Sequence, residues 1–254
     1  SVSLSSDGSR VAIGANNNDG NGSNSGHVRI YQYNNNSWSQ LGADIDGEDS
    51  GDESGYSVSL SSDGSRLAIG GYLNDGNGSS SGHARIYDYN GSAWVQVGAD
   101  IDGEAALDRS GRSVSLSSDG TRVVIGAYLN DAGNASSSDN RGHVRIYDYN
   151  GSAWVQVGAD IDGEGAVDTS GSSISISSDG TRIAIGAPFN DGNGSNSGHV
   201  RVYSISSGGS YQYAWDVDSG GAPSDGTYRA TVAGADKAGN AYSGTDSITF
   251  TLDT

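Results

Sequence analysis

The chain has 254 residues, a formal net charge of −18 at pH 7 and no cysteine. So acidic a chain repels the phosphates of nucleic acid, which excludes nucleic-acid binding, and the lack of cysteine excludes disulfides and thiol chemistry. No run of about 20 apolar residues is present, so we expect no membrane insertion. Because the first residue already lies inside a repeat, we expect a piece of a longer polypeptide.

One phrase recurs four times along the chain. "SVSLSSDGSRVAIGA" begins at Ser1, and close copies begin at Ser57, Ser113 and Ser173. The turn aspartates are 56, 56 and 60 residues apart, at Asp7, Asp63, Asp119 and Asp179. One histidine per copy keeps a similar step, at His27, His83, His143 and His199. A long internal period of this kind indicates a repeat architecture.

Each copy carries four strand signals, which the first copy illustrates. Residues 1–5 and 10–15 alternate apolar and polar side chains, and an Asp-Gly turn of the hairpin type separates them. A Gly/Asn/Ser loop leads to the strand predicted at 27–33, and a short turn leads to the one at 38–42. An acidic loop at 43–55 leads to the next copy. No segment has the spacing of an amphipathic helix.

Four short antiparallel strands per copy predict an all-β chain built as a β-propeller of four-stranded blades. The predicted blades are 1–56, 57–112, 113–172 and 173–207. A solenoid or a sandwich is the competing architecture, although solenoid units are usually shorter. The four copies either close a small propeller, with residues 211–217 as the last strand, or belong to a larger ring.

The repeats resemble a known family. "GAPFNDGNGSNSGHVRVY" at Gly186–Tyr203 is similar to the GAP segment and following strand of FG-GAP repeats in integrin α-subunit propellers and their bacterial relatives. The resemblance covers about residues 1–205. It implies an extracellular propeller, but the family's calcium loop between the first two strands is replaced here by "SSDGS" or "SSDGT", which is too short to hold an ion. The short turn also resembles that of WD-type repeats.

A different pattern begins near Ser210. The segment "DGTYRATVAGADKAGNAYSGTDSITFTLDT" resembles the last strands of bacterial immunoglobulin-like adhesin repeats. We therefore predict two parts: propeller repeats over 1–207 and a partial, β-sandwich-like immunoglobulin segment over 208–254. The missing strands either precede the propeller, which would then be an insertion, or the segment is a truncated spacer.

Two acidic patterns are candidate calcium sites, because alternating oxygen ligands suit this hard cation. The first is "DIDGE", for which the bland alternative is a solvated turn; its residues are Asp44, Asp46, Glu48, Asp100, Asp102, Glu104, Asp160, Asp162 and Glu164. The second, for which a flexible loop is the alternative, comprises Asp19, Asn21, Ser23, Asp75, Asn77, Ser79, Asp191, Asn193 and Ser195. The third copy departs from the second pattern after Asp131.

Repeated aromatic and histidine positions have structural and functional interpretations. The functional interpretation of the histidines is that they bind a transition metal or sense pH. The structural interpretation, which we favour, is that each makes a hydrogen bond within its own blade. The tryptophans at Trp38, Trp94 and Trp154 pack between blades or stack on sugars. Tyrosines that alternate with core positions are expected to line an exposed ligand-binding face: Tyr31, Tyr33, Tyr87, Tyr89, Tyr147 and Tyr149.

These patterns favour a binding function over catalysis. The histidines and carboxylates recur with the repeat, whereas an active site breaks a repeat with one unique constellation, so we expect no enzyme. The first hypothesis is an extracellular, cell-surface adhesin module that binds glycans or proteins, with calcium as its cofactor. The second is a structural spacer or filament subunit whose partners are copies of itself. The third is an accessory domain of a secreted hydrolase.

Overall fold

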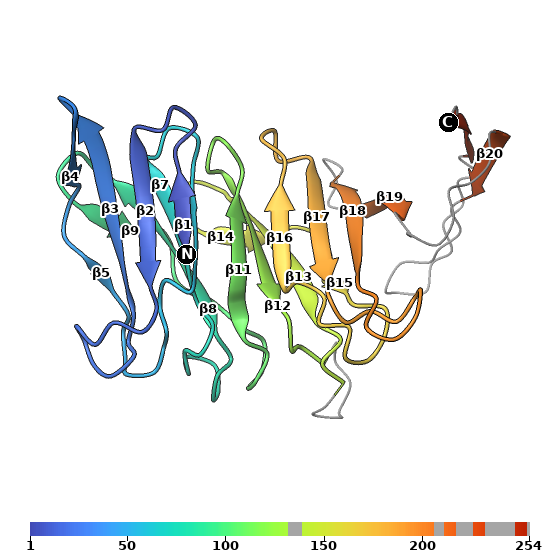
Figure 1. The fold of residues 1–254 in the computed structure, drawn as a ribbon, viewed down its shortest axis with the longest axis horizontal. Helices are drawn as coiled ribbons and strands as arrows, with labels where there is room; N and C mark the ends of the chain where they lie inside the picture. The colour runs from blue at the N-terminus through green and yellow to red at the C-terminus, as the bar shows by residue number, and fades with distance from the viewer. Residues whose placement is uncertain (132–138, 206–210, 217–225, 232–246, 253–254) are drawn as a thin grey trace. The chain divides into compact units, whose positions relative to one another are not determined.

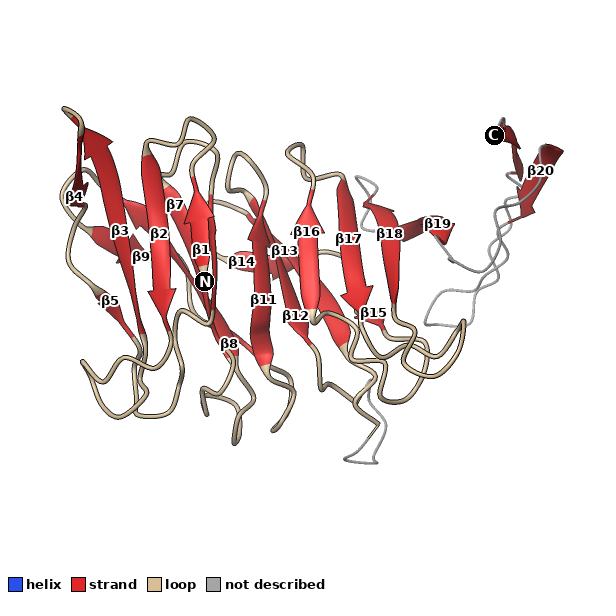
Figure 2. Cartoon of the chain, viewed as in Figure 1, coloured by secondary structure: helices blue, strands red, loops and turns tan. Residues whose placement is uncertain are grey.

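The computed structural model describes residues 1–131 and 139–205, and the backbone of the strands at 211–216, 226–231 and 247–252. Within these ranges every regular element is a β-strand (Figure 2). The chain divides into two compact units, Ser1–Val217 and Asp218–Thr254. Over the same ranges we find no helix whose length and apolar content would let it cross a membrane.

The first unit holds four antiparallel sheets, which follow the four repeats (Figure 1). The first sheet contains β1 Val2–Leu4, β2 Arg10–Ala15, β3 His27–Asn34, β4 Ser37–Gln40 and β5 Ile45–Asp46. The second contains β6 Ser57–Leu60, β7 Arg66–Gly71, β8 His83–Tyr89, β9 Trp94–Gln96 and β10 Ile101–Asp102. The third contains β11 Ser110–Leu116, β12 Arg122–Ala127, β13 His143–Tyr149, β14 Trp154–Gln156 and β15 Ile161–Asp162. The fourth contains β16 Ser173–Ile176, β17 Arg182–Ala187, β18 His199–Ile205 and β19 Tyr211–Asp216.

The four predicted strands of each complete repeat are present, and each pairs with its neighbour in the sequence. The first hairpin closes through its turn aspartate: Asp7 Oδ1 accepts hydrogen bonds from the Ser5 hydroxyl at 2.7 Å and the Ser9 N–H at 2.9 Å. Gly8 follows with a φ of 69°, in the left-handed region that glycine occupies without strain. The same aspartate contacts recur in the other three turns.

The acidic segment predicted as a loop contains a short strand instead. Ile45 pairs with Val28 and Asp46 with His27, so β5 continues the edge of the sheet beyond β4. β10 and β15 repeat this pairing in the next two sheets. The buried side chain of Ile45 explains the strand, because it places an apolar residue against the core between the first two sheets.

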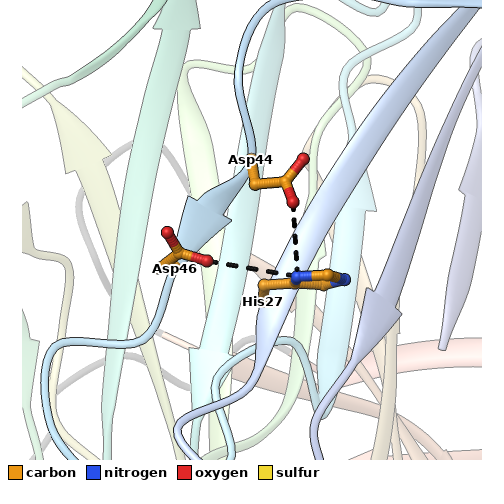
Figure 3. A group of neighbouring side chains, drawn as sticks. All are labelled: His27, Asp44 and Asp46. Atoms are coloured by element: carbon orange, nitrogen blue, oxygen red, sulfur yellow. Dashed lines mark ion pairs between the residues drawn. The ribbon is translucent and has the colours of Figure 1, made fainter. Parts of the chain in front are cut away.

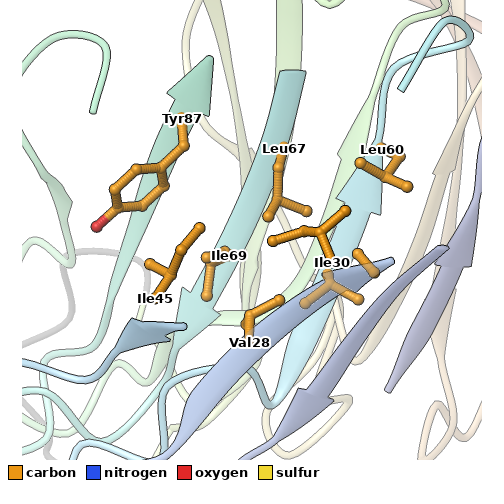
Figure 4. Packing of buried hydrophobic residues seen from close by; sticks show 9 residues of the cluster. Val28, Ile30, Ile45, Leu60, Leu67, Ile69 and Tyr87 are labelled. Carbon is orange, nitrogen blue, oxygen red and sulfur yellow. The ribbon is translucent and has the colours of Figure 1, made fainter. Parts of the chain in front are cut away.

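The sheets stack face to face, and the apolar residues between them form the core. Between the first two sheets, Val28 and Ile30 pack against Leu67, Ile69 and Tyr87 (Figure 4). Equivalent clusters lie between the second and third sheets and between the third and fourth. Repeated antiparallel sheets of four main strands, three of them extended by a short fifth strand, form a β-propeller-like arrangement when packed in this way. We call each sheet a blade from here on.

Serines of the repeated phrase connect the first strands of successive blades. The Ser3 hydroxyl accepts a hydrogen bond from the Leu60 N–H at 2.9 Å, and the Ser59 hydroxyl accepts one from Leu116 N–H at 3.0 Å. Serine therefore has two roles here: it supplies the polar positions of the alternating strand, and it contacts the following blade. This dual role explains why β1, β6, β11 and β16 share almost the same sequence.

The outer faces of the first and fourth blades are uncovered within the described residues. Val2 and Leu4 are 72% and 60% exposed, whereas their equivalents in the second blade, Val58 and Leu60, are buried by the first blade. In the fourth blade Val200 is half exposed, although the equivalent Val28 is fully buried. The same apolar repeat positions thus differ in exposure because of their neighbours alone.

The C-terminal division lies later than predicted. β19 is hydrogen bonded to β18 and completes the fourth sheet, so the first unit extends to Val217 rather than to residue 207. In the second unit β20 Gly226–Thr231 and β21 Ser247–Leu252 pair antiparallel. The rest of the predicted immunoglobulin-like segment lies outside the described residues.

Candidate functional sites between the blades and at the turns

A histidine and two carboxylates meet between the first and second blades. His83 begins β8 and is 1% exposed, while Glu48 follows β5 of the preceding blade and Asp100 precedes β10. The His83 Nδ1 atom lies 3.8 Å from Glu48 Oε2 and 3.6 Å from Asp100 Oδ2. Both separations exceed hydrogen-bond length, and this buried nitrogen has no hydrogen-bond partner.

The remaining carboxylate oxygens of this cluster contact two further side chains. Gln96 donates its amide N–H to Asp100 Oδ1, and the Arg85 guanidinium lies 3.5 Å from Glu48 Oε1. Arg85 also donates a hydrogen bond of 2.8 Å to the carbonyl oxygen of Asp46. Each carboxylate is therefore held through one oxygen while its other oxygen faces His83.

The second and third blades repeat this cluster with Glu104, His143 and Asp160. The His143 Nδ1 atom lies 3.8 Å from Glu104 Oε2, and Gln156 donates to Asp160 Oδ1 at 2.7 Å. Burial lowers the pKa of His143 to about 4, so its ring is neutral at pH 7. Burial and the negative charge of Asp160 raise the pKa of Glu104. The cluster thus gathers two acidic groups around a neutral imidazole.

The first and fourth blades have different versions of the cluster. In the first blade His27 meets Asp44 at 3.5 Å and Asp46 at 4.0 Å, all from the same blade (Figure 3). Arg29 there forms a two-pronged ion pair with Asp44, with distances of 2.9 and 3.0 Å. In the fourth blade His199 lies 3.7 Å from Glu164, but the acidic motif that supplies the second carboxylate is missing from this repeat.

The structure separates the predicted ligands of each "DIDGE" motif. Asp44 and Asp46 face His27, whereas Glu48 of the same motif reaches the next blade. Asp102 and Asp162 use their backbone carbonyl oxygens to accept hydrogen bonds from Arg145 and Arg201 of the following blades. The carboxylates of one motif therefore face two different blades, and calcium binding by them stays a prediction.

The second candidate calcium loop is held by its own hydrogen bonds. Asp19 accepts the Asn24 N–H at 2.8 Å, and Asn21 donates its amide N–H groups to the carbonyl oxygens of Gly47 and Glu48. The Asp75 and Asn77 pair makes the same contacts in the second blade, and Asp191 accepts the N–H of Asn196 in the fourth. The amide nitrogens of Asn21 and Asn77 are thus engaged as donors, and calcium binding by these loops stays a prediction.

The prediction of an exposed tyrosine face is wrong for two of its residues. Tyr87 and Tyr147 are each 8% exposed and belong to the cores between blades. The alternating pattern was interpreted as a sheet with one buried face, but stacking buries both faces. Tyr33, Tyr89 and Tyr149 instead stack against the tryptophan of their own blade, with ring centroids 5.2 to 5.4 Å apart, and Tyr31 lies partly buried.

The predicted packing of tryptophan between blades agrees with the structure at two positions. The indole N–H of Trp94 donates to the carbonyl oxygen of Leu41, and that of Trp154 donates to Val97, each at 2.9 Å. Trp38 is 47% exposed because the described residues place no blade before the first one.

A polar hollow lies where the Ser-Asp-Gly turns of three blades meet. It has a volume of about 310 Å³ and is lined by Ser6, Asp7, Ser62, Asp63, Ser118 and Asp119. Backbone hydrogen bonds join the turns in series, from Ser6 N–H to Ser62 O and from Ser62 N–H to Ser118 O, both 2.8 Å. The Ser9 N–H and the Ser5 hydroxyl lower the pKa of Asp7 to about 2. The hollow is therefore rimmed by exposed, ionised carboxylates.

Sequence reasoning treated these turns as hairpin connections and did not predict that they meet. It also missed the arginines and glutamines beside the histidine clusters. A signal existed in the repeat: each "HxR" places Arg85 or Arg145 on the same strand face as its histidine, and each glutamine precedes its aspartate by four residues. Those spacings identify candidate neighbours within a blade, but not the glutamate that comes from the preceding one.

Comparison with known proteins supports the fold alone. No protein-family model and no curated protein sequence matches the chain. Among solved structures, it is similar to a putative 6-phosphogluconolactonase from Bacteroides uniformis, with 13% identity and a TM-score of 0.55 over 83% of this chain and 51% of that one. The chain thus spans about half the length of that protein. It is also similar to the β-propeller domain of the Trilobed protease from Pyrococcus furiosus, with 11% identity and a TM-score of 0.46 over 85% and 56% of the two chains.

Proposed function

We propose that this chain is a non-catalytic binding module that recognises glycans through the hollow at the Ser-Asp-Gly turns. The observation that carries the proposal is the lining of that hollow, where serine hydroxyls and exposed aspartates from three blades converge. Paired carboxylate oxygens accept hydrogen bonds from adjacent sugar hydroxyls, while serine hydroxyls donate or accept as needed. Because one serine and one aspartate recur in each turn, the hollow presents regularly spaced acceptors, which suit a glycan built of repeating sugar units.

The wider setting of the proposal is an extracellular adhesin. The FG-GAP-like phrase of the repeats and the immunoglobulin-like phrase near the C-terminus support it, as does the acidic, cysteine-free composition. The name of the lactonase neighbour does not support a lactonase activity here, because likeness at 13% identity reaches no further than the fold. Calcium binding by the acidic segments stays a prediction.

A glycan array tests the binding proposal directly. We expect binding that survives chelation of calcium and that weakens at least tenfold in D63N, which keeps the Oδ1 acceptor needed by the turn but removes the charge from the hollow. The matched control is D49N, which removes one exposed charge outside the hollow. Equal binding by both variants would contradict the assignment of the hollow, and an absence of glycan binding would contradict the proposal.

One observation favours a second function, that of a spacer or self-assembling subunit. The uncovered Val2, Leu4 and Ile13 face of the first blade and the half-exposed Val200 of the fourth are the two kinds of face that pack together between internal blades. Exposed apolar faces of this kind favour association. Concentration-dependent sedimentation distinguishes this function, since the glycan module requires no self-association. A third setting, as the accessory domain of a secreted hydrolase, stays a prediction.

A further inference from the structure

We propose that the two internal blade interfaces bind a divalent transition metal of the zinc type, one ion at Glu48–His83–Asp100 and one at Glu104–His143–Asp160. Each site would join two blades, because the glutamate belongs to one blade and the histidine and aspartate to the next. This inference concerns metal binding in the body of the stack, so it is independent of glycan recognition at the turns.

The first support is the contact geometry around His83. Its buried Nδ1 atom has no hydrogen-bond partner, and the facing carboxylate oxygens are 3.6 and 3.8 Å away. Those separations are too long for a hydrogen bond. They are close to the distance of about 3.4 Å that separates two ligand atoms of a tetrahedral zinc ion whose bonds are near 2.0–2.1 Å. The three ligand atoms of each cluster all lie within 4.8 Å of one another.

The second support is the arrangement of the neighbouring side chains. Gln96 holds one oxygen of Asp100, and Arg85 faces one oxygen of Glu48, so the oxygen left on each carboxylate is turned toward the histidine. Hydrogen bonds to the outer oxygens of ligating carboxylates orient metal sites in this way. The second cluster repeats the arrangement with Gln156 and Arg145.

The ligand set selects the class of ion. An imidazole nitrogen with two carboxylate oxygens suits zinc and similar divalent ions, whereas calcium takes six to eight oxygens. Three protein ligands leave a fourth position for water. A divalent cation would also relieve the repulsion between two carboxylates that the fold places beside the same buried nitrogen.

The clusters of the first and fourth blades serve as internal comparisons. His27 shares Asp44 with Arg29, which engages both oxygens of that carboxylate. Among the side chains that the structure describes, His199 faces Glu164 without a second carboxylate. Each lacks one element of the proposed site, so we expect neither to bind zinc tightly.

Calorimetric titration of the metal-free chain with zinc tests the proposal, with cobalt(II) as the spectroscopic probe. We expect two zinc ions per chain and visible cobalt absorption typical of four-coordinate nitrogen and oxygen ligation. H83Q and H143Q should each remove one ion, whereas H199Q should retain both. Where a histidine variant fails to fold, E48Q replaces it, because Glu48 is 43% exposed; we expect it to weaken one site at least ~10-fold. No zinc binding, loss of an ion in H199Q, or equal competition by calcium would overturn the inference.

Discussion

A glycine in the second strand of each blade sets how closely two blades approach, and replacing it should separate them. Gly70 lies in β7, and a Cβ atom added there would fall well under 3.0 Å from the backbone carbonyl oxygen of Gly111, in the next blade. The Gly70 backbone has no positive φ, so alanine is compatible with its conformation. The added Cβ would also meet the Ser57 hydroxyl of its own blade, which can rotate, so the expected effect of G70A comes mainly from the clash with the next blade.

The size of the effect follows from which atoms must move. The Gly111 oxygen is backbone and cannot rotate away, so one blade must shift by about 1 Å to restore a normal contact. Such a shift would loosen the packed cluster of Ala84, Val114 and Ile125 between these blades. Forced overpacking costs about 1–3 kcal/mol, and we place G70A at about 3 kcal/mol because backbone takes part. For a unit of this size that corresponds to a loss of roughly 6–12 °C in Tm.

The fourth blade supplies the matched control. Gly186 occupies the same position in β17, but a Cβ there would meet only the Ser173 hydroxyl, which can rotate. G186A should therefore leave stability unchanged or raise it by about 0.5 kcal/mol through the unfolded chain. Urea unfolding of both variants, followed by tryptophan fluorescence, makes the comparison. Equal destabilisation of G70A and G186A would refute the close approach of blades as the reason for this glycine.

Two further substitutions test contacts between blades, and a third tests the pH dependence of stability. W94F removes the indole donor to Leu41 O and should cost about 1–2 kcal/mol in urea unfolding, whereas W38F, at an exposed ring, should change stability by less than about 0.5 kcal/mol; similar costs would contradict the contact. R66K breaks the two-pronged pair with Asp88 and the bond to Gly120 O and should cost about 1–2 kcal/mol, while R182K, at an exposed position, should be nearly neutral. In the metal-free chain the pKa of His143 is about 4 when folded, against the ordinary value of 6.5 that it regains on unfolding. As the pH falls, the unfolded chain therefore binds the proton first. Stability should fall by about 3 kcal/mol between pH 6.5 and 4, and H143Q should flatten this slope; an unchanged slope would exclude His143 as its cause.

The repeat pattern predicted the strands well because their causes are local. Alternating serine and apolar residues, together with an Asp-Gly turn, specify a hairpin without reference to the rest of the chain. The burial of Tyr87 could not be read from the same pattern, since a strand buried on both faces differs from a half-buried one only by its neighbours. β5 escaped prediction because two residues give no detectable alternation.

The candidate site was predicted only in its parts. Sequence reasoning selected Glu48, His83 and Asp100 in separate categories, as calcium ligands and as a structural histidine. Their spacing along the chain does not reveal that Glu48 contacts the histidine of the next blade, whereas Asp100 contacts the histidine of its own blade. That information lies in the stacking of blades, which brings residues 35 and 52 positions apart to one point.

Each blade presents complementary halves of one interface on its two faces. At two of these contacts the face toward the preceding blade supplies the donor, Arg85 or the Trp94 indole, and the preceding blade supplies the acceptor, the carbonyl oxygen of Asp46 or Leu41. Arg66 donates in the opposite direction, to the carbonyl oxygen of Gly120 in the following blade. Arg29 has no preceding acceptor among the described residues and pairs instead with Asp44 of its own blade. The repeated residues at these contacts are therefore committed to stacking, so contacts with a ligand must come from the turns and loops that the interfaces leave exposed.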